Sequence, residues 1–411
     1  MKGRGWMKGT KKMKRYQLIV IGGGRLGSVI AGQAATWGAH VALLDPGGVG
    51  EEDFFAYEGM VDVYKGSVRF LTEHEVEVAG QVRLAGKAFI IALERVREVP
   101  EPASVAATGE VTEESGWRQP PTKKWVVLGG TPHGIEWAQA LARQGAQVTV
   151  VETGTRLLPD YDPECLSILE ASLQQEGVRV RCHTQVVKVV QRANKKIIQL
   201  QFDGLVEALE IDEIVSADAS LPQVSGLGLA ELGLTYKEGG VVTDSWMRTS
   251  CSHIYAVGPQ VHGRPDCGVW PEEVRRVTMN ALLGTKHRID YSIAPRIVKT
   301  DPPLVAVGMS EEQARQEDEG ARVWRAQRMT GLVKLITRRD GAIAGIHAVG
   351  PDVDGPVEAL REAKRNRVCL DRPERFQQLL QQNRTSWAHS LPVWWGDWVD
   401  KVIRAYVRLR R

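Results

Sequence analysis

Three glycines near the N-terminus have the spacing of a phosphate-binding turn. Gly22, Gly24 and Gly27 form a GxGxxG pattern that follows an apolar strand predicted over Gln17–Ile21 and opens a helix. In such a turn the first glycine permits the tight bend, the second lets the backbone approach a pyrophosphate, and the third lets helix and strand pack closely. Asp45 lies 21 residues beyond Gly24, at the end of the next apolar strand, where an acid can bind both hydroxyls of an adenosine ribose. These residues predict a dinucleotide site; the alternative is that the glycines now serve only helix–strand packing.

A second turn, with the sequence GGTPHG, begins at Gly129. It keeps Gly134 and the acid Glu152, but Thr131 stands where the middle glycine would be. A Cβ at this position pushes a pyrophosphate outward, and threonine is poor in the positive-φ geometries that glycine allows. Pro132 cannot donate an N–H to a phosphate. If a nucleotide binds here, Glu152 favours NAD over NADP, because the carboxylate repels a 2′-phosphate.

The two turns belong to an internal repeat. Residues 20–45 and 127–152 align without a gap at an offset of 107, with nine identities. Each copy reads as an apolar strand, a glycine turn, a small-residue helix, a glycine stop and a second apolar strand that ends in an acid. This is a βαβ unit, and its near-continuous apolar strands favour a parallel sheet covered on both faces.

The remaining segments are read more coarsely. Residues 76–99 alternate as strands, residues 100–122 are typical of a linker, and residues 178–215 predict a strand meander. Residues 331–350 predict two strands around a turn at Arg339–Asp340–Gly341, which marks a separate α+β domain.

Composition excludes several classes of protein. The chain has 411 residues, a net charge of +3 and five cysteines without a CxxC pair, which argues against a disulfide framework or a zinc site and fits a reducing, cytoplasmic compartment. The basic N-terminus has no apolar segment of the kind found in secretory signals. No metal ligands and no nucleic-acid-binding pattern are predicted.

The two units and the segments after them resemble the flavin-dependent pyridine nucleotide–disulfide oxidoreductases. The matching pieces are YQLIVIGGGRLGS, GGTPHGIEWAQALARQGAQVTVVETGTRLLPDYD, LPQVSGLGLAELGL, MRTSCSHIYAVG, and PPLVAVGMSEEQA with GAIAGIHAVG, which together cover most of residues 15–350. The resemblance implies FAD on the first unit, NAD(P)H on the second, and a C-terminal domain that forms a homodimer.

The resemblance also implies an α/β fold with two Rossmann-like domains, the second inserted in the first, and a C-terminal α+β domain of the dimerisation type. The expected division is a basic arm over 1–15, an FAD-type domain over 16–117 and 244–290, an NAD-type domain over 118–243, an interface domain over 291–375, and a tryptophan-rich basic helical tail over 376–411.

The catalytic residues of that family are missing from the matching positions. Its redox-active cysteine pair and the lysine just after it have no counterpart, because the segment after Asp45 contains no cysteine; the partner of that lysine survives as Glu136. The histidine–proline dyad has only a faint echo at His389, and we predict no catalytic residue. Thiolate attack needs a sulfur next to the flavin, so disulfide reduction is not expected.

Flavin-contacting motifs are also altered. The family's Ala-Thr-Gly corresponds to Ala92–Leu93–Glu94, and its Gly-Asp corresponds to Gly258–Pro259, where proline supplies neither a carboxylate nor an N–H. The Gly-Arg ahead of a proline corresponds to Ala219–Ser220. The expected cofactor-binding residues are therefore Gly22, Gly24, Gly27, Asp45, Gly129, Gly134, Glu152 and Gly258, with FAD at a weakened site and NAD(H) at a weaker one.

Three functions remain open at this stage. The first is a pseudoenzyme that keeps at most one dinucleotide on the first unit and acts as a scaffold or regulator. The second is an active NAD(P)H–FAD oxidoreductase that passes electrons to a quinone, oxygen or a protein without a dithiol. The third is an interaction protein with empty pockets. The basic termini suggest docking either on a protein or peripherally on an anionic membrane surface.

Overall fold

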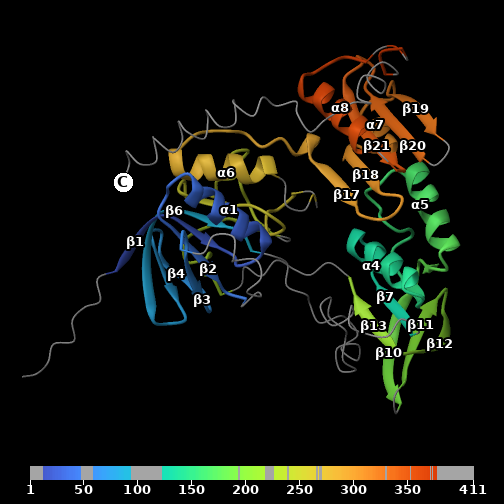
Figure 1. Cartoon of the computed structure of the whole chain (residues 1–411), viewed down its shortest axis with the longest axis horizontal. Helices are drawn as coiled ribbons and strands as arrows, with labels where there is room; N and C mark the ends of the chain where they lie inside the picture. Colours follow the sequence, from blue (N-terminus) through green and yellow to red (C-terminus); the bar gives the residue numbers. More distant parts are fainter. Residues whose placement is uncertain are drawn as a thin grey trace, which may run out of the picture. The chain divides into compact units, whose positions relative to one another are not determined.

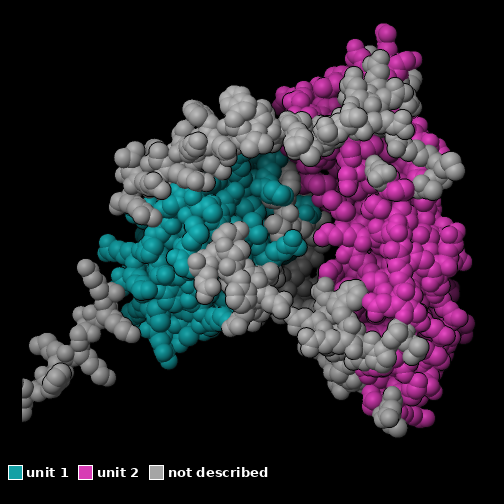
Figure 2. Space-filling view, viewed as in Figure 1, with its two compact units in different colours: residues 1–96, 221–290, 391–411 teal, residues 97–220, 291–390 magenta. Residues whose placement is uncertain are grey.

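The computed structural model describes most of the chain between residues 13 and 376. The described residues are 13–47, 59–93, 123–192, 195–217, 226–237, 240–264, 267, 271–328, 331–351, 353–370, 372 and 374–376. The chain divides into two compact units: unit 1 contains residues 1–96, 221–290 and 391–411, and unit 2 contains residues 97–220 and 291–390 (Figure 2). Each unit is therefore discontinuous in sequence.

Unit 1 is built on a seven-stranded sheet. Its strands are β1 (Lys14–Ile21), β2 (Val41–Asp45), β3 (Asp62–Lys65), β4 (Val68–Thr72), β5 (Glu75–Val78), β6 (Val82–Ile91) and β16 (Ile254–Ala256). The order is β3-β2-β1-β6-β5-β4, and β16 also pairs with β6. Strands β3, β2, β1, β6 and β16 are parallel, whereas β4 and β5 form an antiparallel meander with the first half of β6. The unit also contains the short hairpin of β14 (Tyr236–Lys237) and β15 (Gly240–Val241).

Two helices, α1 (Arg25–Thr36) and α6 (Pro271–Leu283), pack against each other and against the parallel strands of this sheet (Figure 1). Alternate residues of β1 and β6, such as Ile19 and Phe89, instead join a core with the meander and the segment around Leu229. A parallel sheet needs apolar cover on both faces, and the two sets of contacts supply it. Strand β1 begins at Lys14, three residues before the predicted start, because residues 14–16 pair with residues 84–86 of β6.

The described residues of unit 2 form three sheets. The parallel sheet β13-β7-β8-β9 consists of β7 (Lys124–Leu128), β8 (Gln147–Val151), β9 (Arg179–Arg181) and β13 (Glu213–Ser216), with helices α4 (Pro132–Arg143) and α5 (Pro163–Gln175). The antiparallel sheet β10-β11-β12 consists of β10 (Gln185–Arg192), β11 (Lys195–Phe202) and β12 (Leu205–Ile211).

The third sheet has the order β17-β18-β21-β20-β19 and is antiparallel throughout. It consists of β17 (Pro295–Val298), β18 (Leu304–Gly308), β19 (Arg322–Arg328), β20 (Gly331–Thr337) and β21 (Ile343–Val349), accompanied by a 3-10 turn over Tyr291–Ile293 and helices α7 (Glu311–Glu317) and α8 (Asp354–Arg365). The predicted turn between β20 and β21 is confirmed, and Gly341 adopts a φ of +86° there. With these sheets the predicted α/β fold class is confirmed.

The internal repeat has the same structure in both copies. Helix α1 covers residues 25–36 and α4 covers residues 132–143. The first residues of the two helices are therefore 107 positions apart, as are their last residues, and this is the offset of the alignment. Each helix follows a parallel strand and leads to another, β1 to β2 in unit 1 and β7 to β8 in unit 2. The sequence repeat is therefore a structural repeat.

In the part of the chain that the structure describes, the division into units differs from the predicted domain boundaries chiefly at two places. Residues 221–243 belong to unit 1, and residues 291–390 belong to unit 2 together with the second βαβ unit. One reason is a shared hydrophobic core, in which Trp125, Leu166 and Leu169 lie in the same cluster as Val298 and Leu332 of the third sheet. The C-terminal sheet and the second nucleotide fold of this chain are thus packed as one body.

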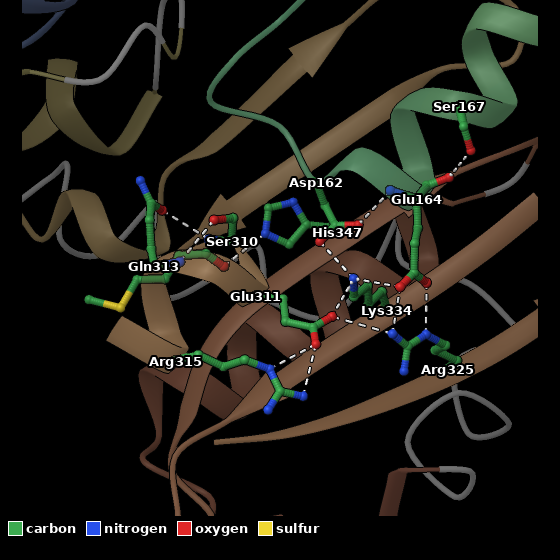
Figure 3. A network of polar contacts seen from close by, with 11 residues as sticks. Asp162, Glu164, Ser167, Ser310, Glu311, Gln313, Arg315, Arg325, Lys334 and His347 are labelled. Carbon is green, nitrogen blue, oxygen red and sulfur yellow. Dashed lines mark hydrogen bonds and ion pairs between the residues drawn. The ribbon is translucent and has the colours of Figure 1, made fainter. Parts of the chain in front are cut away.

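A buried ionic network reinforces that junction (Figure 3). Lys334 of β20 is 1% exposed, and its Nζ lies 2.8 Å from Asp162, 3.1 Å from Glu164 and 2.8 Å from Glu311. Asp162 also caps α5, since its Oδ1 accepts the amide of Glu164. Burial alone lowers the pKa of Lys334, but the hydrogen bonds of Asp162 and Glu311 raise it above its ordinary value. A charged lysine therefore joins α5 to the third sheet.

His347 of β21 lies beside this network and is fully buried (Figure 3). Its Nε2 is 2.8 Å from the carbonyl oxygen of Met309, so Nε2 carries the proton and donates it. Among the described residues no hydrogen-bond partner reaches Nδ1. Burial lowers the pKa of His347 to about 4, and the ring is neutral at physiological pH.

Candidate nucleotide-binding site

The residues predicted for the first nucleotide site meet at one edge of the unit 1 sheet. Gly22 directly follows β1, Asp45 ends β2, Ala92 directly follows β6, and Gly258 comes two residues after β16. Because these four strands are parallel, their carboxyl ends lie at the same edge. In open α/β sheets this edge is where ligands bind.

The first turn leaves no room for side chains at two of its glycines. Gly22 has a φ of +137°, and a methyl group on it would lie 2.1 Å from the carbonyl oxygen of Ala92. A methyl group on Gly27 would lie 1.9 Å from the carbonyl oxygen of Gly22, which is the close helix–strand approach expected of the third glycine. The amide of Gly22 donates to the carbonyl of Leu44 across to β2. The turn is therefore held tightly between β1, β2 and β6.

Gly23 is a further position that must be glycine, although the sequence analysis did not assign it to the site. A methyl group on Gly23 would lie 2.3 Å from Cγ of Asp45, whose side chain is fully buried. Oδ1 of Asp45 accepts the amide of Gly47. The sequence did contain a signal for Gly23, because the second copy has the identical residue, Gly130, at the matching position. Both copies pack an acid against this glycine.

The N-terminus of α1 has no side-chain cap. Gly24 is the N-cap residue, with φ −75° and ψ −174°, and there is no side-chain cap hydrogen bond at this position. No acidic side chain occupies that first turn either. An uncapped helix N-terminus presents backbone N–H groups and partial positive charge, both of which favour a bound phosphate.

The second turn has the same backbone frame. Gly129 has a φ of +98°, and a methyl group on Gly134 would lie 2.1 Å from the carbonyl oxygen of Gly129. Thr131 has φ −76° and ψ 165°, close to the values of Gly24. The expectation that threonine is strained here by a positive φ is therefore wrong, because the middle position of both turns is extended backbone that any residue can adopt.

Thr131 acts instead through its hydroxyl group. Its Oγ1 accepts the amide of Gly134 at 3.2 Å and donates to the carbonyl oxygen of Ala217 at 2.8 Å. Pro132 occupies the first helical position and has no N–H to offer a phosphate. Of the backbone N–H groups that the first turn of α4 could offer to a phosphate, that of Pro132 is therefore absent and that of Gly134 is already hydrogen-bonded to Thr131.

The acid of the second copy is bound by its own loop. The two carboxylate oxygens of Glu152 accept the amides of Gly130 and Gly154, each at 2.6 Å. A nucleotide ribose would have to compete with these two charge-assisted hydrogen bonds, which are stronger than those between neutral groups.

The segment after β16 contributes a residue that the sequence analysis missed. Gly258 has a φ of +90°, and a methyl group on it would lie 2.6 Å from Cδ2 of Leu26 in α1. Gln260, two residues later, is fully buried; its Nε2 donates to the carbonyl of Ile91 at 2.6 Å and to that of Val257. Its Oε1 has no hydrogen-bond partner among the described residues. In the sequence, the only signal for Gln260 was that a polar residue directly follows Gly258–Pro259.

Glu136 and the cysteines are the remaining residues that bear on disulfide chemistry. Glu136 accepts the amide of Lys299 at 2.7 Å, so it links α4 to the loop after β17. None of the five cysteines, all of which lie in the described residues, forms a disulfide. Burial raises the pKa of Cys165 to about 12 and also raises the pKa values of Cys182 and Cys251, which keeps these three as thiols at neutral pH.

Several predictions fall outside the described residues: most of the basic arm, the linker over 100–122, Glu94, Ala219–Ser220, His389 and nearly all of the tail over 376–411. The last two residues of the predicted arm, 14 and 15, are described and belong to β1. In the part of the chain that the structure describes, no helix is long and apolar enough to cross a membrane. The same residues contain no group of three acidic, histidine or cysteine side chains that could hold a metal ion.

Comparisons with known proteins agree on one family. Residues 49–272 match the family model described as pyridine nucleotide-disulphide oxidoreductase. Mercuric reductase of Lysinibacillus sphaericus is 26% identical over 313 residues, which are 72% of this chain and 57% of that protein. Dihydrolipoyl dehydrogenase of Bacillus subtilis is 27% identical over 319 residues, which are 73% of this chain and 67% of that enzyme. The chain thus spans little more than half the length of the mercuric reductases it matches.

A solved structure shares the fold. The HOCl-induced flavoprotein disulfide reductase RclA from Escherichia coli has a TM-score of 0.73 and 21% sequence identity. The likeness covers 89% of this chain and 99% of that one.

Proposed function

Because this chain belongs to the pyridine nucleotide–disulphide oxidoreductase family, whose members bind FAD and NAD(P), we propose that it is a member that keeps one adenine dinucleotide on the first glycine turn and has lost disulfide reduction. Its role is then that of a scaffold or regulator whose state depends on the bound dinucleotide. The difference between the N-termini of α1 and α4 carries this proposal.

The first turn fits the pyrophosphate and adenosine part of such a ligand. Gly24 places no side chain at the N-terminus of α1, and a twelve-residue helix stands behind it. The amides of that first turn would hold the pyrophosphate. Asp45 is the acid at the position that binds an adenosine ribose, and its Oδ1 accepts one loop amide, that of Gly47, at 3.2 Å. Gly22 and Gly27 maintain the close packing of the turn, since neither tolerates a methyl group.

The second turn does not fit a dinucleotide as well. The hydroxyl of Thr131 occupies the amide of Gly134, and Glu152 is engaged by Gly130 and Gly154. Hydride transfer from NAD(P)H to a flavin needs both ligands bound, so weak binding at α4 argues against turnover. The protonated thiols of Cys165, Cys182 and Cys251 argue in the same direction, because the thiolate is the nucleophile in disulfide exchange.

The flavin end of an FAD would meet altered residues. Pro259 stands where the family has an acid and donates no N–H, and Gln260 beside it offers a neutral Oε1. When bound, the flavin supplies electron transfer; this chain supplies contacts for the dinucleotide backbone and one amide oxygen near Gly258. FAD and NAD both carry the adenine dinucleotide part, and the proposal covers either.

Absorption spectroscopy of the purified protein tests the proposal. We expect uptake of one equivalent of FAD or NAD, no bleaching of any flavin band on addition of NADH, and no reduction of lipoamide or a disulfide dye. Bleaching by NADH would replace the proposal with an active oxidoreductase that works without a dithiol. A colourless protein that takes up neither FAD nor NAD would overturn it in favour of an interaction protein with empty pockets.

A further inference from the structure

Unit 1 has a cluster of positive charges around one indole ring. The cationic groups of Arg248, Lys286 and Arg288 lie 4.4, 5.4 and 5.9 Å from the ring centroid of Trp246. We call these four residues the Trp246 platform. Arg248 and Trp246 are half-buried, whereas Lys286 and Arg288 are exposed. Cation–π attraction to the negative face of the ring holds the like charges together.

A buried asparagine fixes the backbone of the platform. Asn280 of α6 is fully buried; its Nδ2 donates to the carbonyls of Trp246 and His287, and its Oδ1 accepts the amide of His287 and the hydroxyl of Thr285. The amide of Ile289 also bonds to the carbonyl of Ser245. The strand-connecting segment at 244–248 and the loop at 285–289 are therefore held side by side before any ligand arrives.

Two of the neighbouring cations are neutralised by acids. Asp244 pairs with Arg248 at 2.9 Å, and Glu272 pairs with Arg276, whose guanidinium also donates to the carbonyl of Arg288. These two arginines serve the structure of the platform.

Lys286 and Arg288 are different, because neither pairs with an acid among the described residues. Arg275, on the first half of α6, likewise forms no ion pair with a described acid. An arrangement that orders cations without neutralising them is suited to a ligand that brings the negative charge.

The size of the platform points to a small, doubly charged group. All three cations lie within 5.9 Å of one ring centroid, so the platform concentrates its positive charge around a single indole. We propose that the Trp246 platform binds a phosphate monoester dianion. A phosphorylated side chain of a protein partner and a free small phosphate share this chemistry.

Other ligands fit less well. Stacking of a nucleobase needs a free indole face, and the guanidinium of Arg248 already lies 4.4 Å from the centroid. Membrane insertion needs an aromatic ring that projects into lipid, whereas Trp246 is half-buried beneath its cations. A single carboxylate carries only one charge and satisfies fewer of the available donors than a phosphate.

His287 provides an internal reporter of binding. Burial, and then the charges of Arg276 and Arg275, lower the pKa of His287 below its ordinary value. A dianion bound beside Lys286 and Arg288 would offset the repulsion from the arginines and raise that pKa. The shift can be followed by NMR of the imidazole ring, with the resonance assigned from a His287→Gln variant.

Titration calorimetry on the full chain tests the proposal. The probes are inorganic phosphate, a short phosphoserine peptide and the same peptide with serine. We expect both phosphate probes to bind, the serine peptide not to bind, and a Lys286→Gln/Arg288→Gln variant to bind phosphate probes about tenfold or more weakly. The matched control is Arg83→Gln/Lys87→Gln, which removes the same charge from β6 of the same unit and should leave binding within about twofold.

The outcomes distinguish a phosphorylated partner from a free phosphate, and they distinguish both from failure of the proposal. Binding of the phosphopeptide about tenfold tighter than inorganic phosphate assigns the site to a phosphorylated partner; equal binding assigns it to a free phosphate. Phosphate held at the α1 turn does not depend on Lys286 or Arg288, so equal binding by the double variant and the native chain overturns the proposal. Binding to vesicles of phosphatidylserine without binding to either phosphate probe also overturns it, as does an unchanged pKa of His287.

Discussion

An exchange of the middle residues of the two turns tests how this chain distinguishes its two nucleotide folds. Gly24 and Thr131 have nearly the same backbone angles and both are N-cap residues, so each can replace the other without backbone strain. We predict that Gly24→Thr weakens dinucleotide binding while the protein stays folded. The introduced hydroxyl should bond to the amide of Gly27, as that of Thr131 bonds to the amide of Gly134.

The size of each effect follows from these contacts. Threonine and glycine differ at an N-cap by only a few tenths of a kcal/mol, so Gly24→Thr should change the free energy of unfolding by less than about 0.5 kcal/mol. Loss of one hydrogen bond from an amide to a charged phosphate costs about 1.5–3 kcal/mol of binding. The dissociation constant should therefore rise by about tenfold to about 150-fold, and the added side-chain volume increases the loss.

Thr131→Gly is the matched control. It removes the hydroxyl that bonds to Ala217, which should cost about 1 kcal/mol of stability, and it should leave dinucleotide affinity unchanged because Pro132 and Glu152 still disfavour the second turn. Isothermal titration with FAD and with NAD measures affinity, and urea unfolding followed by circular dichroism measures stability. Native affinity in Gly24→Thr, or weakened affinity in Thr131→Gly, would refute the assignment of the ligand to α1.

Three further predictions concern stability and thiol chemistry. Lys334→Met should destabilise the protein by about 3–5 kcal/mol in urea unfolding, because it leaves Asp162 buried without its partner; an equal loss in the exposed Lys195→Met control would contradict this. The pKa of His347 is about 4 in the folded protein, below its ordinary value of 6.5. The contribution of the neutral ring to the free energy of unfolding is therefore complete above about pH 6.5 and is lost as the pH falls towards 4. The free energy of unfolding should fall by about 3 kcal/mol more over that range in the native chain than in His347→Gln, and parallel pH curves would show that the ring does not titrate as argued. Cys165, with a pKa raised to about 12 by burial, should resist iodoacetamide in the folded protein at neutral pH, whereas the exposed Cys369 reacts; mass spectrometry of the alkylated peptides checks the order.

Much of the fold was predictable because its signals are local. The repeat at an offset of 107 placed α1 and α4 within the correct segments, and the glycine turn and Asp45 marked the edge of a parallel sheet. Glycine spacing, apolar runs and a strand-terminal acid lie within one βαβ unit, and a short stretch of chain is enough to encode them.

The tertiary structure decided what each of these signals means. The sequence identified Thr131 as a departure but attributed it to backbone strain, whereas its effect depends on Ala217, more than eighty residues away. Gln260 and the Trp246 platform were not predicted, since their contacts join segments that only folding brings together.

The two levels of information therefore answer different questions about this protein. The sequence by itself determined the family resemblance and the α/β class, and it predicted the first glycine turn as the better-preserved nucleotide site. Only the tertiary structure decided that one helix N-terminus lacks a side-chain cap and the other is capped, because a cap is a hydrogen bond between particular atoms and depends on the orientation of side chains. The same holds for the charges around Trp246, whose spacing in the sequence does not reveal that one ring gathers them.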